Sequence, residues 1–348
     1  MFVLECQKSG NVFWSPYIST LPTKISNFPI FFNKYELNLL SGSYFFNYVE
    51  TMKKQISGEY ILLTEINGGI ISFSFQEYLT TKVILSSRIF SLKIKNNDEK
   101  VLIPYADMIN FDITKIGQTF WHFDENMQEF VLKANKNIKK FEYLSENYGL
   151  KSNLRLFINY GYTLKDNPIH EFYFDLCLDS EDPLILLKQE FFNITTLKIA
   201  SLCFSLEDPK NYEKVFCVIR MIEFIGNSID FNQMIKAYLV EENNCKGLKY
   251  NSINNEIKMH KKMIQICQEY KIVMLTNSQK IDNIKSNFDL IDSENISNIS
   301  KYFESEIEGI NLIIEFSNQA IDLLKSDYIK AFKYINEIRR KKSYSGYF

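Results

Sequence analysis

The chain has 348 residues, of which 46% are hydrophobic and 24% are charged, and its formal net charge is −2. This length allows two domains or three small ones, and the composition is ordinary for a soluble globular protein. A charge balance without basic excess argues against proteins that bind nucleic acid through phosphate contacts. We therefore expect no direct nucleic-acid partner.

Two features of the sequence concern the cellular compartment. Glu5 and Lys8 interrupt the short apolar start before a signal-peptide core forms, and no segment reaches the apolar length that spans a membrane. The six cysteines are scattered without a C-x-x-C pair, and the chain has only three histidines. These patterns predict reduced cysteines, no metal site, no membrane partner and a cytoplasmic or nuclear location.

Residues 1–84 are predicted to be mainly helical. The aromatic segment Trp14–Pro22 is closed by proline, which is typical of packing at a turn. Asn33 followed by Glu36 has the pattern of a helix N-cap with its reciprocal partner. A single helix with the sequence YELNLLSGSYFFNYVETMKKQ is expected to follow.

Residues 85–168 change to short strands. Val101–Pro104 is an apolar run after an Asn-Asn-Asp turn signal, and it predicts a strand that follows a hairpin loop. Phe130–Leu132 predicts another short strand. We expect several small sheets in place of one doubly wound sheet, and no G-x-G-x-x-G motif indicates a Rossmann site.

Two Tyr-Gly pairs stand near the end of this region, Tyr148-Gly149 and Tyr160-Gly161. Their spacing predicts a strand end, a tight turn at Gly149, a short helix and another turn at Gly161. Taken alone, this stretch leaves both tyrosines open to interpretation as packing residues or as functional residues.

Helices are predicted to dominate from Phe172 onward. Asn255 opens a run with helical spacing of apolar residues. The last helix is expected to begin near Ile307 and to end at the basic run Arg339–Lys342, since cations suit a helix C-terminus.

Short motifs in the first half of the chain follow one another in one order. They are Trp14-x-x-Tyr17-x-x-x-Leu21-Pro22, Glu36-Leu37 with Leu40-x-Gly42-Ser43, Ser87-Arg88-x-Phe90, Pro104-x-Ala106-Asp107-Met108-x-Asn110, Glu142 with Asn147-Tyr148-Gly149-x-x-Ser152-Asn153, Tyr160-Gly161-Tyr162, and Asp166-Asn167-Pro168. This ordered set resembles SET-domain methyltransferases of the Rubisco large-subunit lysine methyltransferase type. The group includes relatives that methylate ribosomal proteins, nuclear proteins or a histidine of actin.

The resemblance implies an α+β fold, with a SET-like core of several short β-sheets, a helical insertion and an all-α C-terminal domain. On this pattern we assign residues 1–84 to the helical insertion and 85–168 to the C-terminal part of the SET core. Residues 169–348 are assigned to a helical domain like the substrate-binding domain of the family. The implied activity is S-adenosylmethionine-dependent methyl transfer to a lysine of a protein substrate, by a monomer.

The resemblance also implies the parts that single residues play. Tyr148 stands at the position of the catalytic tyrosine, where a hydroxyl can orient the nucleophile and stabilise charge. The cofactor-binding residues are Arg88, Asn110 and Phe111, and the substrate-binding residues are Tyr160 and Asp107. Two alternatives stay open: Asp107 as a structural cap on its turn, and Tyr160 as a core aromatic residue.

The sequence departs from the family pattern in three places. The family has a Gly-x-Gly turn against the methyl donor before the Trp14 motif, and this chain contains no Gly-x-Gly. Phe111 stands in place of a histidine, and Phe141 replaces a turn glycine. We expect either a truncated sequence or a partly lost donor site. The alternative functions are a catalytically silent SET-fold module that binds protein, and a protein-histidine methyltransferase.

Overall fold

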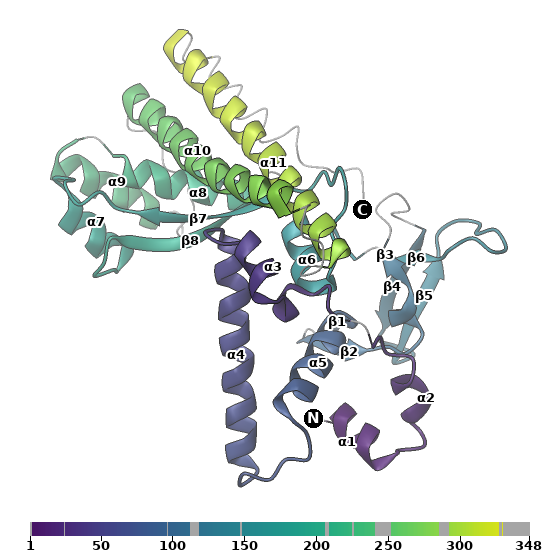
Figure 1. Cartoon of the computed structure of the whole chain (residues 1–348). Coiled ribbons are helices and arrows are strands. Elements are labelled where there is room, and N and C mark those ends of the chain that lie inside the picture. Colours follow the sequence, from purple (N-terminus) through teal and green to yellow (C-terminus); the bar gives the residue numbers. More distant parts are fainter. Residues whose placement is uncertain are drawn as a thin grey trace. The chain divides into compact units, whose positions relative to one another are not determined.

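The computed structural model describes residues 2–23, 25–95, 97–111, 118–146, 148–205, 209–224, 226–240, 252–284, 292–326 and 329. These residues fall into two compact units (Figure 1). The first comprises residues 2–37 and 45–163, and the second comprises 38–44 and 164–326. Each unit has its own hydrophobic core.

Helices occupy most of the described part of residues 1–84, as the sequence predicts. They are α1 (Phe2–Ser9), α2 (Ser15–Ile18), η1 (Pro29–Phe31), α3 (Lys34–Leu39), α4 (Tyr44–Ile66) and α5 (Phe75–Ser86). Phe28 before η1 and Ile30 within it pack with Ile56 of α4 and Val83 of α5 to form a buried cluster. Burial of these apolar side chains holds the short helices in place.

The predicted N-cap at Asn33 is confirmed, but the single long helix after it is wrong. The Asn33 Oδ1 accepts from the Glu36 amide at 3.0 Å, and the Glu36 Oε2 accepts from the Asn33 amide at 2.9 Å. Helix α3 then ends at Leu39, and α4 begins at Tyr44. Gly42 between them has φ +75°, a left-handed conformation that ends a helix.

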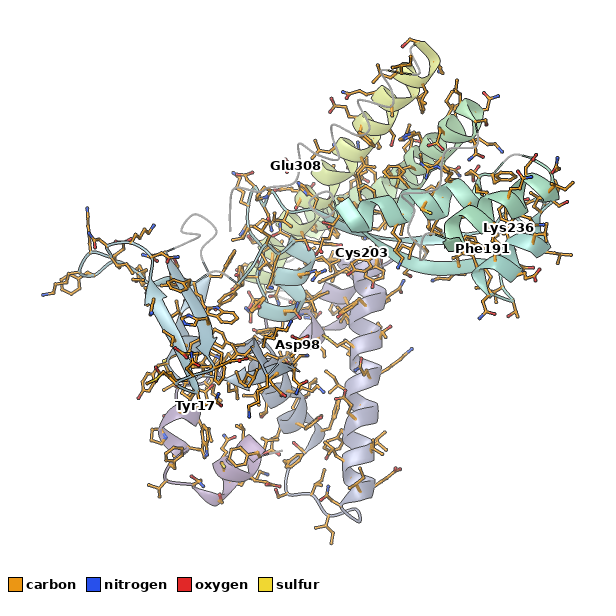
Figure 2. All side chains as sticks on the ribbon, turned by 180° about the vertical axis from the view of Figure 1, so that it is seen from behind. Tyr17, Asp98, Phe191, Cys203, Lys236 and Glu308 are labelled. Atoms are coloured by element: carbon orange, nitrogen blue, oxygen red, sulfur yellow. The ribbon has the colours of Figure 1, made fainter. Side chains whose placement is uncertain are left out.

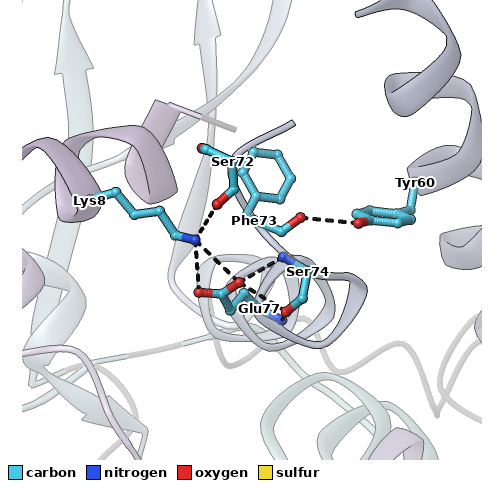
Figure 3. Close-up of polar contacts among 6 residues, drawn as sticks. All are labelled: Lys8, Tyr60, Ser72, Phe73, Ser74 and Glu77. Carbon is cyan, nitrogen blue, oxygen red and sulfur yellow. Dashed lines mark hydrogen bonds and ion pairs between the residues drawn. The ribbon is translucent and has the colours of Figure 1, made fainter. Parts of the chain in front are cut away.

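Helix α5 begins at a second capping box, shown in Figure 3. The Ser74 hydroxyl accepts from the Glu77 amide at 3.2 Å, and the Glu77 Oε2 accepts from the Ser74 amide at 2.7 Å. The ammonium of Lys8 lies 3.2 Å from the other Glu77 oxygen, and the Tyr60 hydroxyl donates to the Phe73 carbonyl at 3.0 Å. The capped end of α5 is thereby joined to α1 and α4.

Among the described residues, the middle of the chain forms three two-stranded sheets, in agreement with the several small sheets predicted. They are the antiparallel pair β1 (Ile89–Ile94) and β2 (Asn97–Leu102), the antiparallel pair β4 (Thr119–Asp124) and β5 (Glu129–Ala134), and the parallel pair β3 (Asn110–Phe111) and β6 (Ser145–Glu146). The predicted strands around Val101 and Phe130 correspond to β2 and β5. Phe90 and Leu92 are buried between the two antiparallel pairs, against Trp121 and Phe130.

The predicted turn, short helix and turn after β6 are confirmed. Gly149 has φ +80° and Gly161 has φ +76°, and both conformations suit glycine. Between them lies α6 (Asn153–Tyr160), whose first turn is capped by the Ser152 hydroxyl and whose last residue precedes Gly161.

The second unit is mostly helical, but it also contains a strand pair that the sequence analysis did not predict. β7 (Glu171–Cys177) pairs antiparallel with β8 (Lys198–Ser205), and α7 (Ile185–Phe192) lies between them in sequence. Phe172, Phe174 and Leu176 alternate toward the core and are fully buried or nearly so. This period of two is the signal of a strand, although the same apolar residues also suit a helix.

The described part of this unit continues with α8 (Pro209–Ile222), α9 (Ser228–Val240), α10 (Ile253–Ile284) and α11 (Ser293–Ser326). α10 and α11 run side by side (Figure 1). A buried ion pair joins α8 to α10, with the Arg220 Nε 2.5 Å from Glu256 Oε1 and the Arg220 Nη2 2.8 Å from Glu256 Oε2. No helix in the described ranges is both long enough and apolar enough to cross a membrane.

The predicted start of α10 near Asn255 is confirmed, whereas α11 begins at Ser293 and not near Ile307. Buried polar residues, Asn295 and Asn298, interrupt the apolar pattern in its first turns. The predicted end of the last helix at Arg339–Lys342 lies outside the described residues.

The described cysteines bear on the prediction of reduced thiols. Cys6, Cys177 and Cys267 carry free thiols, as predicted.

Gly309 of α11 packs tightly against the beginning of β7. A Cβ atom there would lie 2.4 Å from the Phe172 ring and 2.8 Å from the His170 ring. We predict that Gly309→Ala lowers the free energy of unfolding by about 1–3 kcal/mol, because the core must shift to admit one methyl group. Urea unfolding of the full chain measures this change.

Gly58 in α4 is the matched control, since a Cβ there meets no atom within 4 Å. Gly58→Ala is expected to raise stability by about 0.5–1 kcal/mol through helix propensity. Equal unfolding midpoints for the Gly309→Ala variant and the wild-type chain would contradict the close packing.

Glu306 of α11 is buried, and its Oε2 lies 3.2 Å from the Tyr270 hydroxyl of α10. Burial raises the pKa of Glu306 from 4.5 to about 8. Between these two values the folded state holds a proton that the unfolded chain releases. Stability should therefore fall as the pH rises through this window, by about 1.4 kcal/mol per pH unit where the difference is one full proton.

Calorimetric melting temperatures at several pH values between about 5 and 8 measure this dependence. Glu306→Gln, a neutral side chain of the same shape, should flatten the decline. The same slope in the variant and the wild-type chain would show that another group causes it.

Candidate functional site

A buried carboxylate, Asp107, joins three segments of the first unit. Asp107 lies in the short helix η2 (Ala106–Met108), and its Oδ2 accepts from the Tyr17 hydroxyl of α2 at 2.7 Å. The Arg88 Nη1, between α5 and β1, donates to the Asp107 carbonyl at 2.9 Å and lies 3.2 Å from the Oδ2. Tyr17 is labelled in Figure 2. These bonds go to side chains that are distant in the sequence.

The Tyr17–Asp107–Arg88 group retains capacity to bind further groups. Burial and the hydrogen bond to Asp107 raise the pKa of Tyr17, so its hydroxyl stays protonated as a donor. Within the described part of the chain, neither Arg88 Nε nor Asp107 Oδ1 has a hydrogen-bond partner, although both atoms are buried. The ion pair therefore keeps one donor and one acceptor for which the described residues supply no partner.

Tyr148 lies at the centre of an aromatic cluster. Its hydroxyl donates to the Ile109 carbonyl at 2.7 Å. Its ring centroid is 5.5 Å from that of Phe111 and 5.0 Å from that of Tyr160, and Tyr162 lies 6.3 Å beyond Tyr160. Burial is the main cause that raises the pKa of all three tyrosines. The cluster is therefore neutral at physiological pH and lined by ring faces.

The parallel pair β3–β6 sets the position of this cluster. Asn110 is the register partner of Ser145, and Phe111 is the partner of Glu146. Ser145 is held in place by Gln118, because its amide and its hydroxyl both donate to the Gln118 Oε1, at 2.8 and 2.7 Å. Asn110 is exposed on β3. A two-residue strand pair is thus enough to bring the segment before Tyr148 beside the segment after Asp107.

The structure brings the predicted residues together in two groups. Arg88 contacts Asp107, and Phe111 and Tyr160 contact Tyr148, as described above. Asn110 adjoins Phe111 on β3. The roles assigned to these residues in binding and catalysis remain predictions.

The sequence interpretation missed Glu146. Its side chain is 3% exposed and accepts a hydrogen bond from the Trp121 side chain of β4. The Glu146 Oε2 is buried and has no partner among the described residues. Burial raises the pKa of Glu146 to about 7. The sequence feature that could have indicated it is an acidic residue two positions before Tyr148, at the predicted end of a strand.

Comparisons with known proteins place the fold. No protein-family model matches the chain. Two solved structures are similar at a TM-score of 0.65: Rubisco LSMT bound to AdoMet (18% identity, 93% of this chain and 74% of that one) and the SET domain of LSMT bound to lysine and AdoHcy (17% identity, 90% and 72%). The chain has the SET fold of the LSMT type.

Curated proteins of known activity match parts of this SET-fold chain. A ribosomal lysine N-methyltransferase of Schizosaccharomyces pombe is 28% identical over 170 residues, which are 47% of this chain and 30% of that protein. The actin-histidine N-methyltransferase of Homo sapiens is 24% identical over 237 residues, 62% and 39% of the two chains. The SET-fold chain thus spans about a third of the length of these relatives.

We predict that Asp107→Asn destabilises the first unit by about 3 kcal/mol, because it leaves the partly buried Arg88 guanidinium without a counter-charge. Asp98→Asn is the control: Asp98, labelled in Figure 2, is exposed on β2, and its change should stay within about 0.5 kcal/mol. Thermal unfolding of both variants measures the difference. Equal losses of stability in the two variants would show that the Asp107–Arg88 pair does not stabilise the fold.

Proposed function

We propose that this chain is an S-adenosylmethionine-dependent protein methyltransferase that transfers a methyl group to a lysine side chain of a protein substrate. The observation that carries the proposal is the fixed hydroxyl of Tyr148, bound to the Ile109 carbonyl within an aromatic cluster on a SET fold. Likeness to the methyltransferases named above supports the same reaction type.

The chemistry of the aromatic cluster suits this reaction. A lysine must lose its proton before it can attack a methyl carbon, and a desolvating environment lowers the pKa of an ammonium group. The faces of Phe111 and Tyr160 offer such an environment beside Tyr148. The Tyr148 oxygen, held at 2.7 Å from a backbone carbonyl, is a fixed point for positioning the nucleophile.

The residues near Arg88 fit the amino-acid end of S-adenosylmethionine, which carries a carboxylate and an ammonium group. The buried Nε–H of Arg88 can donate to a carboxylate, and the buried Oδ1 of Asp107 can accept from an ammonium. Asn110 and Phe111 follow on β3 as the other proposed contacts. When bound, S-adenosylmethionine supplies an electrophilic methyl carbon on a sulfonium.

Histidine is the second candidate target. Actin-histidine N-methyltransferases match a longer part of this chain than the ribosomal lysine enzyme does, 62% against 47%. Lysine remains the first choice, because one similar structure is an LSMT SET domain with bound lysine. Identification of the methylated side chain by mass spectrometry separates the two.

We predict that Tyr148→Phe lowers the rate of methyl transfer about 100-fold or more, by removing a hydroxyl that stabilises the transition state. The assay uses radiolabelled S-adenosylmethionine with purified ribosomes and purified actin as acceptor proteins. Tyr143→Phe is the control, because Tyr143 is 87% exposed and lies outside the cluster. It should retain wild-type activity.

Two results would contradict this proposal. Undiminished transfer by Tyr148→Phe would reject the part given to its hydroxyl. Calorimetry that detects no binding of S-adenosylmethionine to the wild-type chain would reject the enzyme in favour of a silent SET-fold module that binds protein.

A further inference from the structure

The carboxyl of Glu146 is buried, but its hydrogen bonds do not satisfy both of its oxygens. Strand β6 ends at Glu146, whose side chain is 3% exposed. The bond from Trp121 occupies one oxygen, while Oε2 has no partner among the described residues. A buried carboxylate oxygen without a donor is costly, so a further partner is needed to explain why this residue is acidic.

The same carboxyl lies beside the aromatic cluster. Its register partner is Phe111, whose ring contacts Tyr148. The Glu146 charge also raises the pKa of both Tyr148 and Tyr160. The other charges that act on Tyr148 are Arg88 and Asp107, which have opposite signs and are paired with each other. Glu146 is thus the unpaired negative group at this cluster within the described residues.

A purely structural explanation accounts for only half of these observations. An acceptor for the Trp121 indole needs one oxygen, and the amide of a glutamine would supply it without a charge. The second buried oxygen would still lack a hydrogen-bond donor among the described residues. A cation that enters the cluster would satisfy it.

We propose that Glu146 is the specificity-determining residue of this site: it binds the target nitrogen as a cation and accepts its proton. This inference rests on the proposed methyltransferase function. It favours a primary amine such as the lysine ammonium over nitrogens that arrive uncharged.

An N–H bond of the ammonium breaks, its electron pair stays on nitrogen as the lone pair, and the proton forms an O–H bond with the Glu146 carboxylate. The neutral amine is then the nucleophile that methyl transfer requires. The glutamic acid later releases its proton to water, which restores the carboxylate. A base that titrates near neutral pH is well suited to this exchange.

The first test needs no cofactor. We expect the carboxyl carbon-13 resonance of Glu146 in the full chain to titrate near neutral pH, and its pKa to fall when L-lysine is added at millimolar concentration. L-norleucine, which lacks the side-chain amine, should leave the titration unchanged. The Glu146→Gln spectrum assigns the resonance. A pKa that lysine and norleucine affect equally would overturn the proposal.

The second test measures affinity and activity. Glu146→Gln keeps an acceptor for Trp121 and should weaken lysine binding about 10-fold, which corresponds to about 1.4 kcal/mol. It should also remove the rise of kcat/KM with pH near neutrality. Glu306→Gln, at a buried carboxyl of the second unit, should preserve both. Equal lysine affinity in wild type and Glu146→Gln would overturn the proposal.

The outcomes also separate this inference from the proposed function. A chain that transfers methyl groups but shows an unchanged pH profile in Glu146→Gln is a methyltransferase without this proton acceptor, and the inference fails alone. A chain that fails to bind S-adenosylmethionine refutes the enzyme, whereas the lysine titration still decides whether Glu146 receives a cation.

Discussion

The geometry of the site depends on how one buried carboxylate is satisfied. Asp107 takes hydrogen bonds from Tyr17 and Arg88, which come from segments far apart in the sequence. These bonds compensate for the loss of hydration that burial imposes on an ionised group. They also fix η2, and the chain that leaves η2 presents the Ile109 carbonyl to the Tyr148 hydroxyl. A contact made for stability therefore determines where the tyrosine stands.

The chain buries several carboxyl groups and satisfies them in different ways. Glu256 pairs with Arg220 through two bonds, a fork geometry that keeps both charges in place. Glu306 lies among tyrosine hydroxyls, and burial raises its pKa so far that the neutral form is favoured. Glu146 differs from both, because it has neither a cationic partner nor a full set of donors among the described residues. Such incomplete satisfaction is more typical of functional sites than of structural ones.

Much of the fold follows from local sequence signals. The cap at Asn33, the turns at Gly149 and Gly161 and the strand near Phe130 were all predicted, because each depends on the chemistry of a few neighbouring residues. The break at Gly42 and the early start of α11 were not. Gly42 can be tolerated within a helix or can end it, and the choice depends on packing. In α11, buried asparagines hide the apolar stripe from a pattern based on hydrophobic residues alone.

The candidate site was predicted through the ordered motifs, and composition alone would not have found it. The motifs name Arg88, Asp107 and Tyr148 but say nothing of how they meet. That Tyr17 binds Asp107 depends on contacts between residues 90 positions apart, which no local pattern encodes. Glu146 was missed for a related reason, since a lone acidic residue in a polar run is ordinarily on the surface.

The hydrogen bond from Tyr148 to Ile109 sets the polarity of the site. A phenol has one hydrogen to give, and here the backbone carbonyl receives it. The oxygen therefore turns only lone pairs toward an incoming group. A ligand with an N–H group can donate a hydrogen bond to this oxygen. The oxygen of a carbonyl or an ether cannot, because two acceptors with partial negative charge would face each other.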